Sequence, residues 1–339
     1  MTLERIVITG GQGFLGRQIV RACRESGYDV KVCSRSTGVD LRDGAAFGRW
    51  LSAMAPKCVI HCAAHVGGIG YVGQHAIDVF NDNLRISIGL MEGLRTARIC
   101  RLLTVMPNCT YPGQKSIYRE DEWWDGPIHE SVLMYGLPRK TLWGLCKTYG
   151  DGLGLESAHL ILPNLYGPSD HFDPYRSHAL GALVRKIIEA SRTGESTVEL
   201  WGTGKPVREW MYVEDAAAAI ARFLSLWSGQ TGQSEVGRAP AARSAVEGRD
   251  HPIFNVGVCK GVSIETLANM IRDAVGWDGA FVFDATRPDG AMTKLLDGSR
   301  FQKLTGWSPR VSLPEGIERT VAWYLANVES EQSHACAGV

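Results

Sequence analysis

The chain has 339 residues, 45% of them hydrophobic, which is enough to bury a substantial core without disulfide bonds or a structural metal. Its 36 basic and 36 acidic residues cancel, which excludes the broad positive field of nucleic-acid-binding proteins and indicates a small-molecule partner. No apolar run reaches the roughly 18 residues of a membrane span, and no signal-peptide pattern precedes the first expected strand. We therefore expect a cytoplasmic protein with neither a nucleic-acid nor a membrane partner.

The first expected unit is a strand, a glycine-rich turn and a helix. Residues 4–9 are rich in β-branched side chains, and apolar residues recur at helical spacing from Phe14 onward. Glycines at three-residue intervals lie between them, where a backbone must turn sharply and approach a pyrophosphate, with the free N–H groups of the helix facing the phosphates. This pattern predicts a dinucleotide-binding turn. Its predicted cofactor contacts are Gly10, Gly13, Phe14, Leu15 and Gly16.

Further apolar strands alternate with helical stretches along the first half of the chain. They are expected at 29–33, 58–62 and 102–105. Strands that alternate with helices are typical of an α/β fold with a doubly wound parallel sheet of the Rossmann type.

The end of the second expected strand bears on the choice of dinucleotide. NAD enzymes usually have a carboxylate there for the ribose 2′-hydroxyl, but this chain has Ser34, Arg35 and Ser36. An arginine flanked by serines suits a 2′-phosphate, so NADP is favoured and NAD stays possible; Arg35 could also be a solvated loop residue. Asp40 is a candidate for the adenine amino group, or a turn-forming residue. The other predicted cofactor contacts are Leu41, Ala63 and Ala64.

Five further motifs follow in chain order. They are AAHVGGI at 63–69, NCTYP at 108–112, PNLYGP at 163–168, WGTGKPVRE at 201–209 and FDATRPDG at 283–290. With the glycine turn, they resemble the nucleotide-sugar epimerase/dehydratase family of extended short-chain dehydrogenase/reductases, and within it the GDP-L-fucose synthases.

The resemblance implies a Rossmann domain followed by a smaller α/β C-terminal domain that binds the nucleotide sugar. The expected boundaries are 1–165 for the first domain, with segments near 207–228 and 252–257 returning to it, 166–325 for the second, a flexible insertion at 229–250 and a loose tail at 326–339. It also implies a homodimer formed through helices. Met91, Leu94 and Ala97 could lie in that interface, although core packing explains them equally well.

The implied reaction exchanges protons at C3 and C5 of a GDP-linked 4-keto sugar and transfers a hydride at C4. Proton exchange beside a ketone needs an acid and a base, and reduction needs a proton for the developing alkoxide. By resemblance, Cys109 and His178 are the acid/base pair and Tyr135 is the proton donor. The alternatives are a buried structural cysteine, a surface histidine and a packed tyrosine.

Two residues depart from the family pattern. The family has Tyr-x-x-x-Lys, and this chain places Arg139 at the lysine position, with Lys140 one residue beyond it. Arginine keeps the charge but cannot relay a proton; Lys140 could replace it only if Pro138 shifts the start of the helix. Pro107 replaces a serine or threonine that donates to the substrate, and either Asn108 or Thr110 could substitute for it. Net reduction is therefore less secure than proton exchange.

The predicted nucleotide-sugar contacts are basic, aromatic and polar residues of the second half of the chain. They are Asn164, Lys186, Trp201, Arg208, Arg287 and Asp289. Cations suit the diphosphate and an indole can pack against a base or ribose. The acidic and aromatic segment 119–127 either lines the sugar pocket or caps the domain. His61 and His65 have no third ligand at metal spacing, so no metal site is expected.

Two other functions stay open. One is an epimerase that uses bound NAD(P) for transient oxidation at C4 and returns the hydride. The other, from a different class, is a catalytically silent protein that senses the cofactor or the nucleotide.

Overall fold

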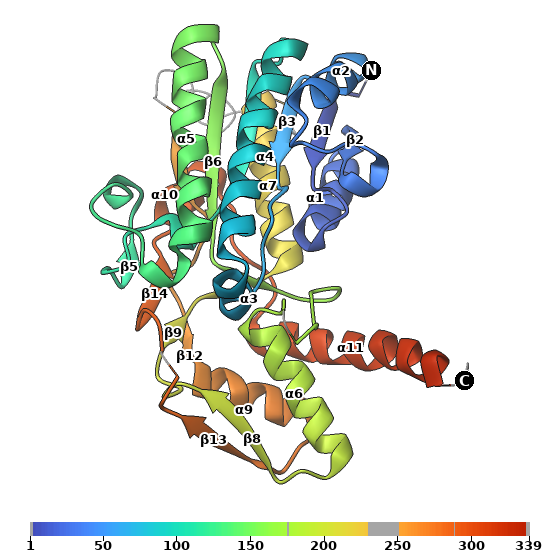
Figure 1. Cartoon of the computed structure of the whole chain (residues 1–339), viewed down its shortest axis with the longest axis vertical. Helices are drawn as coiled ribbons and strands as arrows, with labels where there is room; N and C mark the ends of the chain where they lie inside the picture. Colours follow the sequence, from blue (N-terminus) through green and yellow to red (C-terminus); the bar gives the residue numbers. More distant parts are fainter. Residues whose placement is uncertain (1–2, 175, 230–250, 288, 337–339) are drawn as a thin grey trace.

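The computed structural model describes residues 3–174, 176–229, 251–287 and 289–336, with side chains up to residue 327. The described part has two bodies, one above the other in Figure 1: a sheet sandwiched between helices, and a smaller body around α6, α9 and α11. The expected insertion at 229–250 lies, apart from Gly229, outside the described residues.

The upper body is built on a six-stranded sheet in the order β11-β6-β4-β3-β1-β2. Every neighbouring pair in it is parallel. The strands are β1 (Arg5–Thr9), β2 (Asp29–Cys33), β3 (Cys58–His61), β4 (Arg101–Pro107), β6 (Glu156–Leu162) and β11 (Ile253–Asn255). The inner strands are buried on both faces, which is why their sequences are nearly continuous apolar runs.

Helices cover both faces of this sheet, so the predicted α/β doubly wound Rossmann architecture is confirmed. On one face lie α1 (Phe14–Glu25), α7 (Val213–Ser228) and α10 (Ser299–Thr305). On the other lie α2 (Gly44–Met54), α4 (Ala76–Ala97) and α5 (Leu133–Leu153). Strand β11 and helix α7 therefore pack with the N-terminal segments although they come late in the chain. The proposed domain boundaries stay a prediction.

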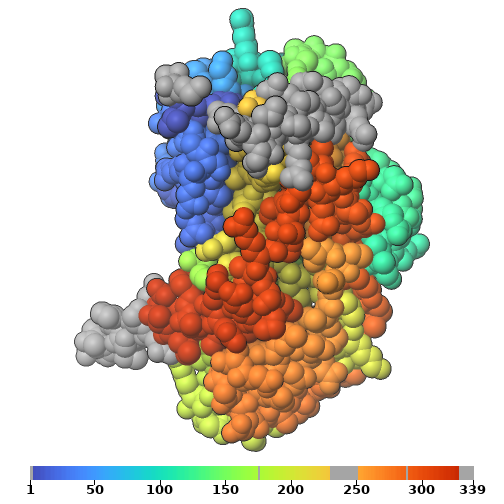
Figure 2. All heavy atoms as spheres, turned by 180° about the vertical axis from the view of Figure 1, so that it is seen from behind, coloured from blue at the N-terminus to red at the C-terminus, as the bar shows by residue number. Residues whose placement is uncertain are grey.

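The lower body has its own apolar core. It contains α6 (Ala179–Thr193), β8 (Thr197–Trp201), α9 (Ile264–Val275), β13 (Ala280–Asp284) and α11 (Leu313–Cys336). The expectation of a loose tail was wrong as far as residue 336, because α11 continues to Cys336. From behind, Figure 2 shows late segments of the chain, in orange and red, forming most of this body and continuing upward beside the sheet.

Short strands and turns connect the two bodies. A four-stranded sheet has the order β12-β9-β14-β5, and β7 pairs with β10. Their bounds are β5 (Ile117–Tyr118), β7 (Asn164–Tyr166), β9 (Val207–Arg208), β10 (Trp210–Tyr212), β12 (Val262–Ser263) and β14 (Thr293–Leu296). The remaining short helices are α3 (Ile69–Gln74), η1 (Arg35–Thr37), η2 (Asn108–Thr110), η3 (Glu120–Glu122) and η4 (Glu130–Val132). Over the described residues, none of the helices is both long and apolar enough to span a bilayer.

Candidate active site

The glycine turn between β1 and α1 forms a cradle that admits no larger side chains. Gly10 has φ +69°, and a Cβ at Gly16 would lie 2.0 Å from the Gly10 carbonyl oxygen. Gly13 is the N-cap of α1 and has no side chain that could bond the first N–H groups of the helix. A cradle of backbone donors at a helix N-terminus fits a dinucleotide pyrophosphate.

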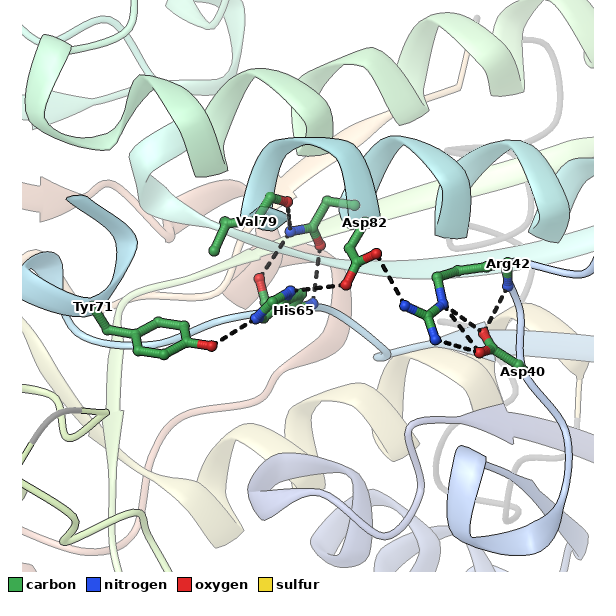
Figure 3. A network of polar contacts seen from close by, with 7 residues as sticks. Asp40, Arg42, His65, Tyr71, Val79 and Asp82 are labelled. Carbon is green, nitrogen blue, oxygen red and sulfur yellow. Dashed lines mark hydrogen bonds and ion pairs between the residues drawn. The ribbon is translucent and has the colours of Figure 1, made fainter. Parts of the chain in front are cut away.

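The predicted adenine end lies at the carboxyl end of β2. Arg35 is exposed in η1, and the Ser34 and Ser36 hydroxyls bond each other at 2.9 Å. Asp40 is already engaged, because it accepts bonds from Nε and Nη2 of Arg42, which also binds Asp82 at 3.0 Å (Figure 3). The Arg42 guanidinium lowers the pKa of Asp40, so this carboxylate stays charged.

Arg139 is deeply buried in α5, with an exposed fraction of 2%. Its Nη1 donates to His61 Nε2 at 3.1 Å and to the Ala63 carbonyl at 3.2 Å, and its Nη2 donates to the Val105 carbonyl at 2.7 Å. Since a guanidinium only donates, His61 accepts at Nε2 and its Nδ1 proton faces the Thr9 hydroxyl at 2.9 Å. Burial and the Arg139 charge hold the His61 pKa well below its usual value, so the ring is neutral.

Tyr135 lies one helical turn before Arg139 on α5. Burial raises its pKa, and the Arg139 charge opposes that shift only in part. At neutral pH Tyr135 is therefore a phenol with a proton to give.

Lys140 does not serve as the replacement cation. Helix α5 begins at Leu133 and continues through Pro138, so the proline does not mark the start of the helix. Lys140 donates to the Trp123 carbonyl and lies 4.4 Å from the Trp124 ring centre. The expectation that Lys140 could hold charge beside Tyr135 was wrong, because at five residues from Tyr135 its side chain leaves on another face of the helix.

Cys109 lies in η2, directly after β4, with an exposed fraction of 9%. A Cβ at Gly136 would lie 2.7 Å from the Cys109 carbonyl, so this glycine lets α5 approach the cysteine backbone. Burial raises the Cys109 pKa to about 11, and the charges of Lys294 and Arg139 oppose the shift. In the resting protein Cys109 is thus a thiol facing two cations that would favour its thiolate.

The neighbours of Cys109 separate the two possible substitutes for Pro107. Thr110 donates its hydroxyl to the Pro107 carbonyl at 2.8 Å and accepts from Trp123 Nε1 at 2.9 Å. Asn108 is buried, and within the described part of the chain its Nδ2 has no hydrogen-bond partner. Asn108 is therefore the residue with an amide donor left to offer.

His178 comes from the lower body, where it is the N-cap residue of α6. His178 as a whole residue is exposed to solvent. The surrounding protein nevertheless desolvates its ring and lowers the His178 pKa, with a smaller contribution from the charge of His171. At neutral pH His178 is a neutral imidazole that can accept a proton.

Lys294 is a buried cation that none of the sequence motifs indicated. It lies on β14 opposite Arg208 of β9, and desolvation lowers the pKa of both side chains. Two adjacent desolvated cations, of which Lys294 also acts on Cys109, suit a diphosphate or a developing oxyanion. A lysine inside the apolar run Thr293–Leu296 was the signal that could have found it.

The other predicted substrate residues divide into two groups. Lys186 and Arg287 lie 5.9 Å and 4.9 Å from the ring centre of the exposed Trp201, so two cations gather at this indole. Asp289 accepts from the backbone and hydroxyl of Thr203, both at 2.7 Å, and Asn164 donates to the Glu209 carbonyl at 3.0 Å. The last two side chains thus hold the loops around the site.

Comparison with known proteins agrees with this class of fold and site, a dinucleotide-binding enzyme of the extended Rossmann type. Residues 6–234 match the NAD dependent epimerase/dehydratase family. The chain is 32% identical to GDP-L-fucose synthase 1 of Arabidopsis thaliana over 334 residues, covering 96% of this chain and 94% of the relative. It is 30% identical to GDP-L-fucose synthase of Escherichia coli K12, covering 96% and 98%.

The chain therefore belongs to the NAD dependent epimerase/dehydratase family, as its motifs predicted. Among solved structures, an NADP-bound GDP-L-fucose synthetase from Naegleria fowleri superposes with a TM-score of 0.80 at 24% identity, covering 97% of both chains. A GDP-6-OMe-4-keto-L-xylo-heptose reductase from C. jejuni superposes with a TM-score of 0.81 at 24% identity, covering 96% and 99%. These two structures support the fold.

Proposed function

We propose that this protein is an NADP-dependent epimerase and 4-reductase of a GDP-linked 4-keto hexose. The observation that carries the proposal is the cluster of Cys109, Tyr135, Arg139 and Lys294 at the carboxyl edge of the sheet, where the two cations lie close enough to act on the thiol and the phenol. Ligands of open α/β sheets bind at that edge. The GDP-L-fucose synthases named above are relatives over nearly the whole chain.

The cofactor would lie along the glycine cradle, with its nicotinamide toward Tyr135. Gly10, Gly13 and Gly16 would hold the pyrophosphate, and Arg35 with the two flanking serines would hold a 2′-phosphate. When bound, NADPH supplies the hydride for C4. Residues 33–36 at the end of β2 read Cys-Ser-Arg-Ser, without the carboxylate usual in NAD enzymes, which supports NADP over NAD.

The acid/base pair starts in complementary states. The Cys109 thiol carries a proton and the His178 imidazole lacks one at neutral pH. A neutral base on one face of the sugar and a neutral acid on the other can remove and return protons beside a ketone. Lys294 and Arg139 would stabilise the thiolate that Cys109 leaves after it has donated its proton.

Tyr135 would protonate the C4 oxygen, and Arg139 would hold a permanent charge beside the phenol. Because Arg139 has three acceptors in the protein and cannot give up a proton, Tyr135 must be reprotonated from solvent by another path. Pro107 also removes one side-chain donor from the oxyanion. These two departures favour, as a second candidate, an epimerase that performs little net reduction.

We also propose a cytoplasmic homodimer that pairs helices α4 and α5 of two copies. Ile77 and Ile88 of α4 and Leu137 of α5 are large exposed apolar side chains. Gly144 lies on the same face of α5 as Leu137, seven residues on, and a Cβ there would meet nothing within 4 Å. Sedimentation of the purified chain measures this state directly.

The test is incubation with a GDP-linked 4-keto hexose in D₂O, with and without NADPH. Deuterium at C3 or C5 without NADPH supports proton exchange, and stoichiometric NADPH loss supports reduction. Cys109→Ser should lower deuterium uptake at least about 100-fold, because an alcohol is a far weaker acid than a thiol, while NADPH affinity stays unchanged. Exposed Cys100→Ser is the matched control. Tight NADPH binding with neither reaction would leave a sensing protein.

A further inference from the structure

A chain of polar contacts crosses the molecule between the predicted adenine end and the segment that carries His178. Asp82 binds Arg42 at 3.0 Å with one oxygen and His65 Nδ1 at 3.0 Å with the other. His65 Nε2 lies 2.9 Å from the Tyr71 hydroxyl (Figure 3). Arg42 in turn holds Asp40, so the contacts run without a break from the loop between η1 and α2 to α3.

The donors along this chain fix its direction. Arg176 Nη2 donates to the Tyr71 oxygen at 3.3 Å, so the Tyr71 proton is free to point to His65 Nε2. With Nε2 as the acceptor, His65 donates from Nδ1 to Asp82. The backbone of His65 is fixed as well, because buried Asn83 bonds both its N–H, at 3.2 Å, and its carbonyl, at 2.8 Å.

A second contact joins the same two segments through their backbones. The Gly68 N–H donates to the Arg176 carbonyl at 3.0 Å. A Cβ at Gly68 would lie 2.3 Å from the Ser177 carbonyl oxygen, so only glycine permits this approach. The Arg176 guanidinium also lies 5.0 Å from the Tyr71 ring centre, over its face.

We propose that Tyr71 is a positioning residue for His178. Through Arg176 it holds residues 176–178 of the lower body against Gly68 and α3 of the upper body, and the contacts from His65 to Asp40 tie that position to the adenine end of the cofactor site. The inference rests on the proposed function, in which His178 exchanges protons at sugar carbon. The other backbone bonds of this segment, from the Arg176 N–H to the Asp173 carboxylate at 3.0 Å and from the Ser177 N–H to the Asp173 carbonyl at 2.9 Å, are local to it.

Proton exchange at carbon depends steeply on the position of the base, and a displacement of about 1 Å can lower a rate about 100-fold. A residue that holds His178 in place should therefore affect the rate of proton exchange at the sugar carbon far more than the affinity for the sugar or for NADPH. Tyr71→Phe is the sharpest change, since it keeps the ring against Arg176 and against His75, 4.4 Å away, and removes only the hydroxyl.

The matched control is Tyr28→Phe. The Tyr28 hydroxyl also bonds a side chain, Ser228 at 2.7 Å, but it lies at the start of β2, at the opposite edge of the sheet from the site. We expect Tyr71→Phe to lower kcat for deuterium exchange at least about tenfold, with KM and the NADPH Kd changed less than about twofold. Tyr28→Phe should leave all three unchanged.

Hydrogen exchange of the Gly68 amide gives a measurement that needs no substrate. Release of the 176–178 segment should speed exchange of this amide in Tyr71→Phe and leave it protected in Tyr28→Phe. Unchanged Gly68 protection, or equal losses of exchange rate and NADPH affinity, would overturn the positioning role. If the wild-type protein exchanges no deuterium into the sugar, the proposed function fails instead, and the Gly68 amide still decides whether Tyr71 holds the segment.

Discussion

At the scale of single residues, Arg139 is the most consequential departure of this chain from its family. A buried guanidinium needs acceptors for its donors, and His61 and two carbonyls supply them for Nη1 and Nη2, while Nε has no partner among the described residues. The sequence revealed Arg139 at the lysine position, but it could not reveal His61 as its partner. The two residues are 78 positions apart, and only the pairing of β3 with β1 and β4 brings His61 beneath α5.

Replacing Arg139 tests the role of its charge. Arg139→Met should lower the rate of C4 reduction at least about tenfold, because Tyr135 loses the cation beside its developing phenolate. It should also lower the free energy of unfolding by about 1–3 kcal/mol, because His61 and Val105 lose a donor. Arg139→Lys, which keeps the charge, is the control. Single-turnover NADPH oxidation and urea unfolding measure the two effects. Reduction by Arg139→Met at the wild-type rate would remove Arg139 from the reaction.

At the scale of elements, the turn between β1 and α1 is the feature that the sequence predicted best. Its spacing of glycines has a local steric cause, which needs no information from the rest of the chain. Elements that depend on distant packing were harder to predict. Helix α5 continues through Pro138 because its apolar face, which includes Leu142 and Cys146, packs on the same core as α4.

The glycine cradle between β1 and α1 can be tested with a single added methyl group. Gly16→Ala would place a methyl group 2.0 Å from the Gly10 carbonyl oxygen and so distort the turn. We expect NADPH affinity to fall more than about tenfold, because the backbone donors no longer converge on the pyrophosphate. Gly73→Ala in α3 is the control, since nothing lies within 4 Å of its added Cβ. Titration of NADPH fluorescence measures both variants, and equal affinity in Gly16→Ala would refute the assignment.

At the scale of the whole molecule, the substrate side of the site is assembled from segments far apart in the sequence. Strand β14 brings Lys294 next to Arg208 and near Cys109, and no local pattern states that these strands pair. The family motifs indicated Cys109 and Arg208. Lys294, opposite Arg208, and the contacts of Arg176 with Tyr71 and Gly68 became visible only in the folded chain.

Two buried carboxyl groups, Asp170 and Glu209, should contribute to the pH dependence of stability. Desolvation raises the pKa of each to about 7. From about pH 4 to 7 the folded chain therefore keeps protons that the unfolded chain releases, so these groups make stability fall as the pH rises through this window. The slope per group is at most about 1.4 kcal/mol per pH unit.

Asp170→Asn should remove one group from this pH dependence. The amide oxygen can still accept the His171 N–H that now bonds Asp170 at 2.7 Å, so the local turn is kept. Buried neutral histidines such as His61 and His159 add a slope of opposite sign, so the prediction concerns the difference from the wild type. We expect the change in unfolding free energy from pH 5 to pH 7 to be more positive in Asp170→Asn than in the wild type, as measured by urea denaturation. Exposed Asp278→Asn is the control and should retain the wild-type slope. A change in unfolding free energy from pH 5 to pH 7 that equals the wild-type change, or is more negative, would contradict the buried, protonated carboxyl of Asp170.

A crystal structure with NADP and a GDP-linked hexose bound tests the proposed site most directly. We expect the sugar ring between the nicotinamide and Cys109, with the Cys109 Sγ and the His178 ring on opposite faces and the diphosphate at Arg208 and Lys294. A sugar ring away from Cys109, or a diphosphate bound elsewhere, would contradict it.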